Sequence, residues 1–226
     1  MAPRYEAVVF DLDGTLIDSL SALARAIHYA RRRCGLGRIA DEVIRDAVGD
    51  GLEMLLSRSF APDEVPAEAR GWFEEHYDEI CCEESRALTD VESTLEALEA
   101  AGVRMAVCTN KPTAFSVKIL EHLGLAPRFA AVVGPDAAGA RKPAGAHVLA
   151  TLSHLDCAPE RALLVGDMPV DVAAARDAGL DVATVPTGSA SREALLDARP
   201  DFFLEHFREV LDLVAPAARA AGPGTR

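Results

Sequence analysis

The feature that most constrains the fold is an alternation of short apolar runs with helical stretches. Apolar runs that predict strands lie at 6–10, 103–108, 129–133, 162–165 and 181–185, and a further run at 202–204 predicts an edge strand. Segments with helical spacing lie between or after them, at 93–101, 113–124, 144–155, 169–178 and 205–214, and 134–142 is predicted to be a loop. Alternating strands and helices predict a parallel sheet with helices on both of its faces.

The stretch from 18 to 86 follows a different pattern and predicts helices without a strand. Helical spacing is found at 20–34, 41–48, 52–60 and 66–80. We therefore predict an α/β protein with a Rossmann-like parallel sheet and an inserted small all-helical cap domain. Its catalytic core is predicted at 1–17 and 87–216, its cap at 18–86, and a disordered tail, rich in Ala, Gly and Pro, at 217–226.

Polar residues follow three of the predicted strands directly. Asp11 and Asp13 come after the first strand, Thr109 after the strand at 103–108, and Asp167 after the strand at 162–165. Ligands of parallel α/β sheets bind beyond the carboxyl ends of the strands, so these residues are expected to meet. Clustered carboxylates repel one another unless a cation or a shared proton relieves them, which predicts a Mg²⁺ site. The alternative for Asp11 to Thr15 is an ordinary polar turn, because Asp, Gly and Thr are common turn residues.

Four segments, in order along the chain, resemble the motifs of the haloacid dehalogenase superfamily, in its phosphoglycolate phosphatase-like branch. They are Asp11-Leu12-Asp13-Gly14-Thr15, Cys108-Thr109-Asn110-Lys111-Pro112, Arg141-Lys142-Pro143 and Gly166-Asp167-Met168-Pro169-Val170-Asp171. The resemblance extends from Val8 to about Val185 and implies a phosphoric monoester hydrolase.

The resemblance and the chemistry of the side chains together assign roles to the acids. Asp11 is the expected nucleophile, which would form an aspartyl-phosphate, and Asp13 is the expected general acid and base. Mg²⁺ is expected on Asp11, the backbone carbonyl of Asp13, and Asp167.

The remaining motif residues are expected to bind or support the phosphate. Thr109, the backbone N–H of Asn110 and the ammonium of Lys142 are predicted to hold phosphoryl oxygens. Thr15 and Asp171 are predicted to support the site without binding the metal directly; Asp171 would reach the water shell of the metal or brace Lys142. The alternative for Asp171 is an acid that complements the dipole of its helix.

In the cap, Val48-Gly49-Asp50-Gly51-Leu52 resembles the specificity loop of that branch, which makes Gly49, Asp50 and Gly51 candidate substrate-binding residues. The alternative is a simple turn between two helices. Trp72, Phe73 and Tyr77 lie at helical spacing and are predicted to form the cap core.

The leading hypothesis for the function is a Mg²⁺-dependent phosphatase for a small phosphate monoester, with 2-phosphoglycolate as the first candidate substrate. As the resemblance implies, true dehalogenases lack an acid at the position of Asp13, so they are disfavoured. Alternatives within the family are a phosphatase for a sugar phosphate or pyrophosphate, and a phosphomutase. The alternative of another class is a catalytically silent phosphate-binding protein.

Charge and cysteine content restrict partners and location. With 23 basic and 36 acidic residues the net charge is -13, which disfavours nucleic acids and anionic membranes as partners. The five cysteines show no metal-ligand spacing, and no signal-peptide pattern is visible, so a cytoplasmic protein is predicted. We expect a small phosphorylated metabolite as its partner and a monomer or homodimer as its assembly.

Overall fold

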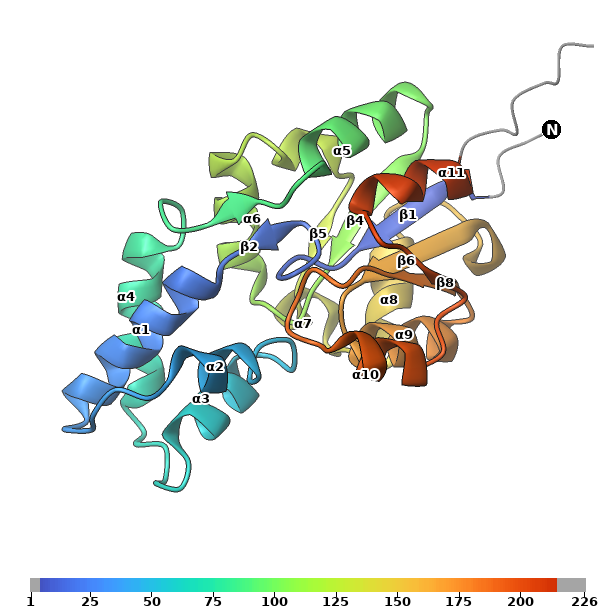
Figure 1. The fold of residues 1–226 in the computed structure, drawn as a ribbon. Coiled ribbons are helices and arrows are strands. Elements are labelled where there is room, and N and C mark those ends of the chain that lie inside the picture. Colours follow the sequence, from blue (N-terminus) through green and yellow to red (C-terminus); the bar gives the residue numbers. More distant parts are fainter. Residues whose placement is uncertain (1–4, 215–226) are drawn as a thin grey trace, which may run out of the picture.

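The structure is a computed structural model that describes residues 5–214 (Figure 1). Within this range six parallel strands form one sheet, in the order β5-β4-β1-β6-β7-β8. Their bounds are β1 (Ala7–Phe10), β4 (Arg104–Cys108), β5 (Val132–Val133), β6 (Ala162–Gly166), β7 (Asp181–Thr184) and β8 (Phe202–Phe203). The predicted Rossmann-like parallel sheet is confirmed, and the predicted tail at 217–226 lies outside the described residues.

Helices cover both faces of this sheet because the central strand is apolar on both of its sides. Val8 and Phe10 of β1 face one cluster of buried side chains, while Ala7 and Val9 face the other, as the alternation of side chains along a strand requires. The helices that follow β3 in the chain are α5 (Val91–Ala100), α6 (Thr113–His122), α7 (Pro135–Ala138), α8 (Gly145–Leu152), α9 (Pro169–Ala178), α10 (Arg192–Asp197) and α11 (Val210–Val214). Buried residues of α5 and α11 join the first cluster, and those of α8 and α9 join the second.

The strand order creates a crevice beside β1. After β1, the chain forms β4 and β5 on one side of β1. It then crosses back and forms β6, β7 and β8 on the other side of β1. Phe10 is therefore aligned with Val107 of β4 and with Val165 of β6. The connections after β1 and β6 leave the sheet in opposite directions, and such a switch point is where α/β sheets bind ligands.

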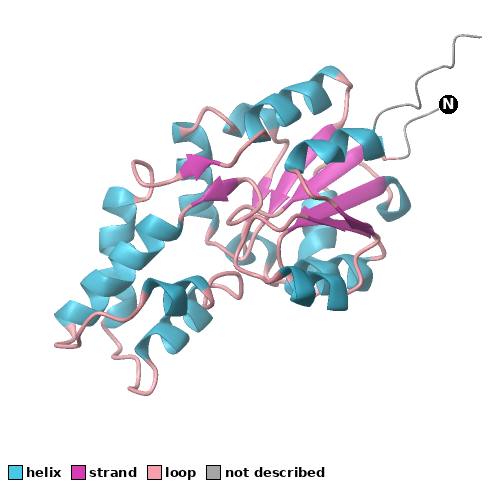
Figure 2. Cartoon of the chain, in the orientation of Figure 1, coloured by secondary structure: helices cyan, strands magenta, loops and turns pink. Residues whose placement is uncertain are grey.

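Four helices lie beside the sheet as a separate group, at the lower left of Figures 1 and 2. They are α1 (Leu20–Arg33), α2 (Asp41–Arg45), α3 (Leu52–Phe60) and α4 (Ala69–Ile80). Two short antiparallel strands, β2 (Ile17–Asp18) and β3 (Arg86–Ala87), pair where the chain enters and leaves this group. The prediction that 18–86 contains no strand was wrong at both ends. Strands of two residues have no apolar periodicity. These two form because the segment that enters the helical group and the segment that leaves it hydrogen-bond to each other.

Four local predictions also need correction. The predicted loop at 134–142 contains α7, which Pro135 begins and Gly139 ends in left-handed conformation. The strand predicted at 129–133 is limited to Val132–Val133, and the last helix begins at Val210 after a 3₁₀ turn. Helix α10 was not predicted, although its N-cap signal is present: the Ser191 hydroxyl accepts a hydrogen bond from the backbone N–H of Ala194 at 3.1 Å. None of the helices within 5–214 combines the length and the apolar character that crossing a membrane requires.

Candidate active site

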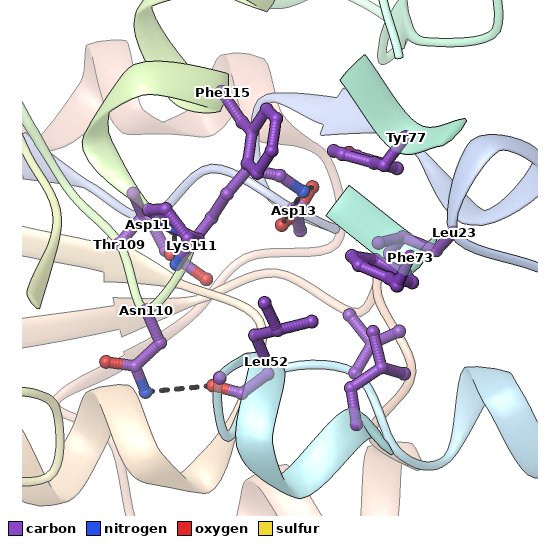
Figure 3. A pocket seen from close by; sticks show the side chains of 15 residues that line it. Asp11, Asp13, Leu23, Leu52, Phe73, Tyr77, Thr109, Asn110, Lys111 and Phe115 are labelled. Carbon is purple, nitrogen blue, oxygen red and sulfur yellow. Dashed lines mark hydrogen bonds and ion pairs between the residues drawn. The ribbon is translucent and has the colours of Figure 1, made fainter. Parts of the chain in front are cut away.

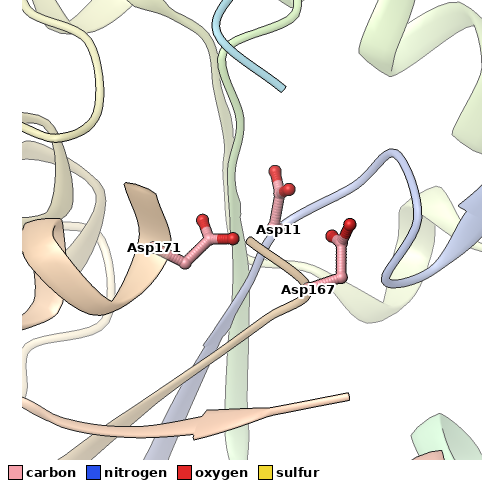
Figure 4. A group of neighbouring side chains, drawn as sticks. All are labelled: Asp11, Asp167 and Asp171. Carbon is pink, nitrogen blue, oxygen red and sulfur yellow. The ribbon is translucent and has the colours of Figure 1, made fainter. Parts of the chain in front are cut away.

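Three buried carboxylates meet at the carboxyl edge of the sheet (Figure 4). Asp11 follows β1, Asp167 follows β6, and Asp171 lies in the first turn of α9. Each contributes an oxygen, and these oxygens all lie within 4.8 Å of one another. The backbone N–H of Asp11 still bonds to the carbonyl of Val165, at 2.9 Å, so the ends of the neighbouring strands hold the first two acids together. The structure thus brings Asp11 and Asp167 together, and it adds Asp171 as an equal member of the cluster.

The ammonium of Lys142 connects two of these acids. Its Nζ lies 2.8 Å from Oδ1 of Asp11 and 2.6 Å from Oδ1 of Asp171, and all three side chains are buried. Asp171 also accepts a hydrogen bond from the backbone N–H of Met168 at 3.0 Å, which anchors its other oxygen. Of the two supporting positions predicted for Asp171, contact with Lys142 is the one that this arrangement contains.

The electrostatics of the cluster favour a bound cation. Burial, followed by the charge of Asp171, raises the pKa of Asp11 to about 6, although Lys142 acts in the opposite direction. Burial and the charges of Asp11 and Asp171 raise the pKa of Asp167 well above its ordinary value. Burial opposes the charge of Lys142, but Asp11 and Asp171 raise the pKa of its ammonium overall. One ammonium thus contacts two of three clustered carboxylates, and carboxylate oxygens are the donors that Mg²⁺ prefers, so this donor set fits that ion.

Asp167 is held by the turn that follows β1 and by a loop after β7. The hydroxyl of Thr15 donates a hydrogen bond to Oδ1 of Asp167 at 2.7 Å. A Cβ on Gly14, whose φ is +84°, would lie 2.4 Å from Oδ2 of Asp167, and one on Gly188 would lie 1.6 Å from the same oxygen. Both positions therefore need glycine, because a side chain at either would displace the carboxylate.

Asn110 joins the core to the cap through its side chain. Its Nδ2 donates to the carbonyl of Gly49 at 2.9 Å and to that of Lys142 at 3.1 Å, while its Oδ1 accepts from the backbone N–H of Lys142 at 2.9 Å. The side chain thereby fixes the backbone of Lys142, a contact that sequence reasoning missed. Thr109 is buried beside it, at the end of β4, and accepts from the backbone N–H of Lys111.

Asp13 lies apart from the acidic cluster and has its own lysine. Nζ of Lys111 lies 2.7 and 2.6 Å from the two carboxylate oxygens of Asp13, and the hydroxyl of Ser19 donates to the same carboxylate. The side chain of Asp13 is thus engaged elsewhere, and metal binding by its backbone carbonyl stays a prediction. Lys111 was not assigned a role from the sequence. The signal available was a lysine directly after Thr109 and Asn110 at a strand end.

Two cavities adjoin these residues. The first, of about 50 Å³, lies between the catalytic edge and the cap (Figure 3), and Asp11, Asp13 and Thr109 line it at the core end. Its cap wall is apolar and comprises Leu23, Val48, Leu52, Leu55, Phe73 and Tyr77. The second, of about 300 Å³, is lined by Asp13 and Asp167 and shares Gly49 with the first.

The predicted specificity loop is divided between these cavities and the cap surface. Gly49 lines both cavities and Gly51 lines the first. Asp50 lines neither, and its carboxylate pairs with Arg58 of α3 at 2.6 Å. Phe73 and Tyr77 are buried in the cap core, as predicted, and also form part of the cavity wall, whereas Trp72 packs against that core and is only partly buried.

Comparisons with known proteins agree with this geometry. Residues 8–185 match the family model of haloacid dehalogenase-like hydrolases. The chain is 33% identical to a phosphoglycolate phosphatase of Vibrio cholerae, over 93% of this chain and 97% of the relative. It is also 33% identical to a phosphoglycolate phosphatase of Agrobacterium fabrum, over 91% of this chain and 90% of the relative. The crystal structure of a predicted phosphoglycolate phosphatase from Haemophilus somnus superposes with a TM-score of 0.85 and 29% identity, covering 93% of this chain and 98% of that one.

Proposed function

Because this chain belongs to the haloacid dehalogenase-like hydrolase family, we propose that it is a Mg²⁺-dependent phosphatase acting on 2-phosphoglycolate. One observation carries the proposal: Asp11, at the end of a central strand, lies 2.8 Å from the buried ammonium of Lys142 and beside Asp167. A carboxylate next to a fixed cation and further acidic ligands suits attack on an anionic phosphoryl group. The names of the relatives support the choice of substrate.

Asp11 acts as the nucleophile in this proposal. One of its oxygens attacks phosphorus, the bond between phosphorus and the ester oxygen breaks, and an aspartyl-phosphate forms; water then releases phosphate and restores the carboxylate. Lys142 orients Asp11 and adds positive charge beside it. Thr109 and the backbone N–H of Asn110 hold phosphoryl oxygens as the charge on them develops.

Asp13 moves the protons of the reaction. In its protonated form it gives a proton to the departing ester oxygen, and the carboxylate that is left then takes a proton from the attacking water. Lys111 and Ser19 hold its carboxylate, and Asp13 lines both cavities. We place the leaving group in the first cavity because Asp11 and Thr109 line this cavity as well, and its volume of about 50 Å³ suits a small leaving group.

Asp11 and Asp167, with Asp171 beside them, would hold Mg²⁺. When bound, this ion would reduce the repulsion between the carboxylate of Asp11 and the phosphate of the substrate. The backbone carbonyl of Asp13 is the further ligand we propose. Thr15 supports this site by holding Asp167 in place.

We also propose residues 1–17 and 87–216 as the catalytic core and 18–86 as a cap that excludes water from the site. Gly49 and Gly51 of the cap loop contribute to the substrate cavity in this proposal. The five free cysteines support a reducing, cytoplasmic location.

A panel of phosphate esters tests the function. With Mg²⁺ present, phosphate release from 2-phosphoglycolate should exceed release from glucose 6-phosphate, glucose 1-phosphate and pyrophosphate. A higher rate on one of the other substrates would reassign specificity, and isomerisation of a sugar phosphate with little phosphate release would indicate a mutase. Binding of phosphate without turnover of any ester would indicate the silent binding protein.

A further inference from the structure

The O–H of Tyr77 has no hydrogen-bond acceptor among the described residues, although the side chain is buried. Tyr77 lies on α4. Its ring is stacked with that of Phe73, with 5.3 Å between the ring centres, and is perpendicular to that of Phe115, with 5.1 Å between the ring centres. Buried polar groups are nearly always paired, because an unpaired one loses its bonds to water without replacement. An unpaired hydroxyl on the wall of the first cavity therefore indicates a ligand atom that would complete its bonding.

The ammonium of Lys111 lies next to this hydroxyl. Its Nζ is 5.2 Å from the centre of the Tyr77 ring, and its side chain is buried. Two carboxylate oxygens of Asp13 account for two of its three N–H donors. Among the described residues, Lys111 is the only basic side chain that lines this cavity. Figure 3 shows how Tyr77, Lys111 and Asp13 gather at one end of it.

We propose that Lys111 and the hydroxyl of Tyr77 together bind the carboxylate of the leaving group. This inference rests on the proposed function and deepens it, because it explains why an ester with an acidic leaving group would be preferred. Asp13 and the apolar cap wall both disfavour a second carboxylate in the cavity, so its charge needs dedicated donors. The ammonium of Lys111 and the O–H of Tyr77 supply them, and burial raises the pKa of Tyr77 to about 12, so its hydroxyl remains a donor.

The same arrangement selects against esters that lack the carboxylate. With a neutral leaving group of equal size, the hydroxyl of Tyr77 stays unpaired and Lys111 loses a bond to an anion. Sites built to bond a polar group of the substrate reject analogues without that group for this reason.

The test is Tyr77→Phe, which removes the hydroxyl and keeps the ring. Since the O–H donates to no described residue in the free protein, the variant should fold and keep its Tm. 2-Phosphoglycolate is compared with ethyl phosphate, in which a methyl group replaces the carboxylate. We expect the ratio of their kcat/KM values to fall by about tenfold or more, mainly through a higher KM for 2-phosphoglycolate. Tyr29→Phe is the matched control: Tyr29 stacks on His76 in the cap, away from the cavity, and its loss should leave the ratio unchanged.

The outcomes separate the inference from the function on which it rests. A preference for 2-phosphoglycolate that persists in Tyr77→Phe overturns the carboxylate site and leaves the function standing. If the wild type hydrolyses neither ester, the proposed function fails. Saturation-transfer NMR of glycolate then decides the inference: weaker glycolate binding by Tyr77→Phe than by wild type supports it, while equal binding or none overturns it.

Discussion

The Nζ of Lys142 lies 2.8 Å from Oδ1 of Asp11, although 130 residues of chain separate the two side chains. The contact ties the end of β1 to the loop that precedes α8, and both groups are buried. A buried ammonium placed against the candidate nucleophile fixes the direction of its carboxylate. It also provides positive charge where an anionic phosphate must approach.

Asp11→Asn should abolish turnover without weakening the fold. The amide cannot form an aspartyl-phosphate, so we expect kcat to fall by about three orders of magnitude or more. Replacing the buried charge removes its repulsion with Asp167 and Asp171, so the free energy of unfolding should not decrease. Steady-state kinetics and urea unfolding measure the two effects. Substantial phosphate release by a variant of verified sequence would contradict the assignment of the nucleophile.

Lys142→Met should destabilise the protein as well as inactivate it. Removing the ammonium leaves Asp11 and Asp171 without their buried counter-ion, a loss that typically costs about 3–5 kcal/mol. Lys118→Met is the matched control, because its pair with Asp78 is exposed and worth about 1 kcal/mol or less. Urea unfolding of both variants gives the comparison. Equal decreases in the free energy of unfolding would contradict the larger cost expected for the buried pair.

Mg²⁺ should raise the Tm of the wild type, and Asp167→Asn should abolish that rise. Ligand binding to the folded state alone stabilises it by about 2.7 kcal/mol at a hundredfold excess over Kd. The variant lacks one of the three clustered carboxylates. Thermal unfolding with and without Mg²⁺ measures the shift, with Asp78→Asn as the control at an exposed carboxylate. An undiminished shift in Asp167→Asn would place the ion elsewhere.

Gly188→Ala should impair activity through Asp167. The new Cβ would lie 1.6 Å from Oδ2 of that carboxylate, so the carboxylate or the loop must move. We expect kcat/KM to fall by about tenfold or more, since even small displacements of catalytic groups are costly. Gly37→Ala, whose Cβ meets no atom within 4 Å, is the control for kinetics and for the Mg²⁺ dependence of activity. Equal activity of the two variants would refute the close packing at Gly188.

We expect the free energy of unfolding to decrease as the pH falls from about 6.5 to 4, because His147 is buried in its neutral form. Burial lowers the pKa of His147 to about 4; its Nε2 lies 3.1 Å from the Val133 carbonyl and its Nδ1 has no partner among the described residues. Between these pH values the unfolded state binds a proton at His147 that the folded state does not bind. The contribution of His147 to the stability of the folded state is therefore complete above about pH 6.5 and is lost on acidification. The loss approaches roughly 3 kcal/mol.

The measurement for His147 is the free energy of unfolding at several pH values for wild type and His147→Gln. Subtracting the two curves removes the effect of the acidic cluster, which both proteins share. The difference should shrink between about pH 6.5 and 4. A difference that does not change with pH would contradict the lowered pKa.

Much of the fold follows from local patterns in the chain. Apolar runs such as 103–108 and 162–165 predict buried strands, and their alternation with helices predicts a parallel sheet. The two-residue strands β2 and β3 were missed because so short a strand has no period to detect. Helix α10 was missed although Ser191 caps it, since one cap residue is a weak signal without apolar spacing.

The sequence by itself placed Asp11, Thr109 and Asp167 at one edge of the sheet, because parallel strands align their carboxyl ends whatever side chains follow them. Only the tertiary structure decided which partner each charged group takes: Lys111 for Asp13, 98 residues away, Arg58 for Asp50, and Lys142 for Asp171. Such pairings depend on distances between segments that meet only after folding. Local periodicity indicates which face of a helix or strand a residue occupies. It carries no information about which side chain of another segment lies opposite that residue.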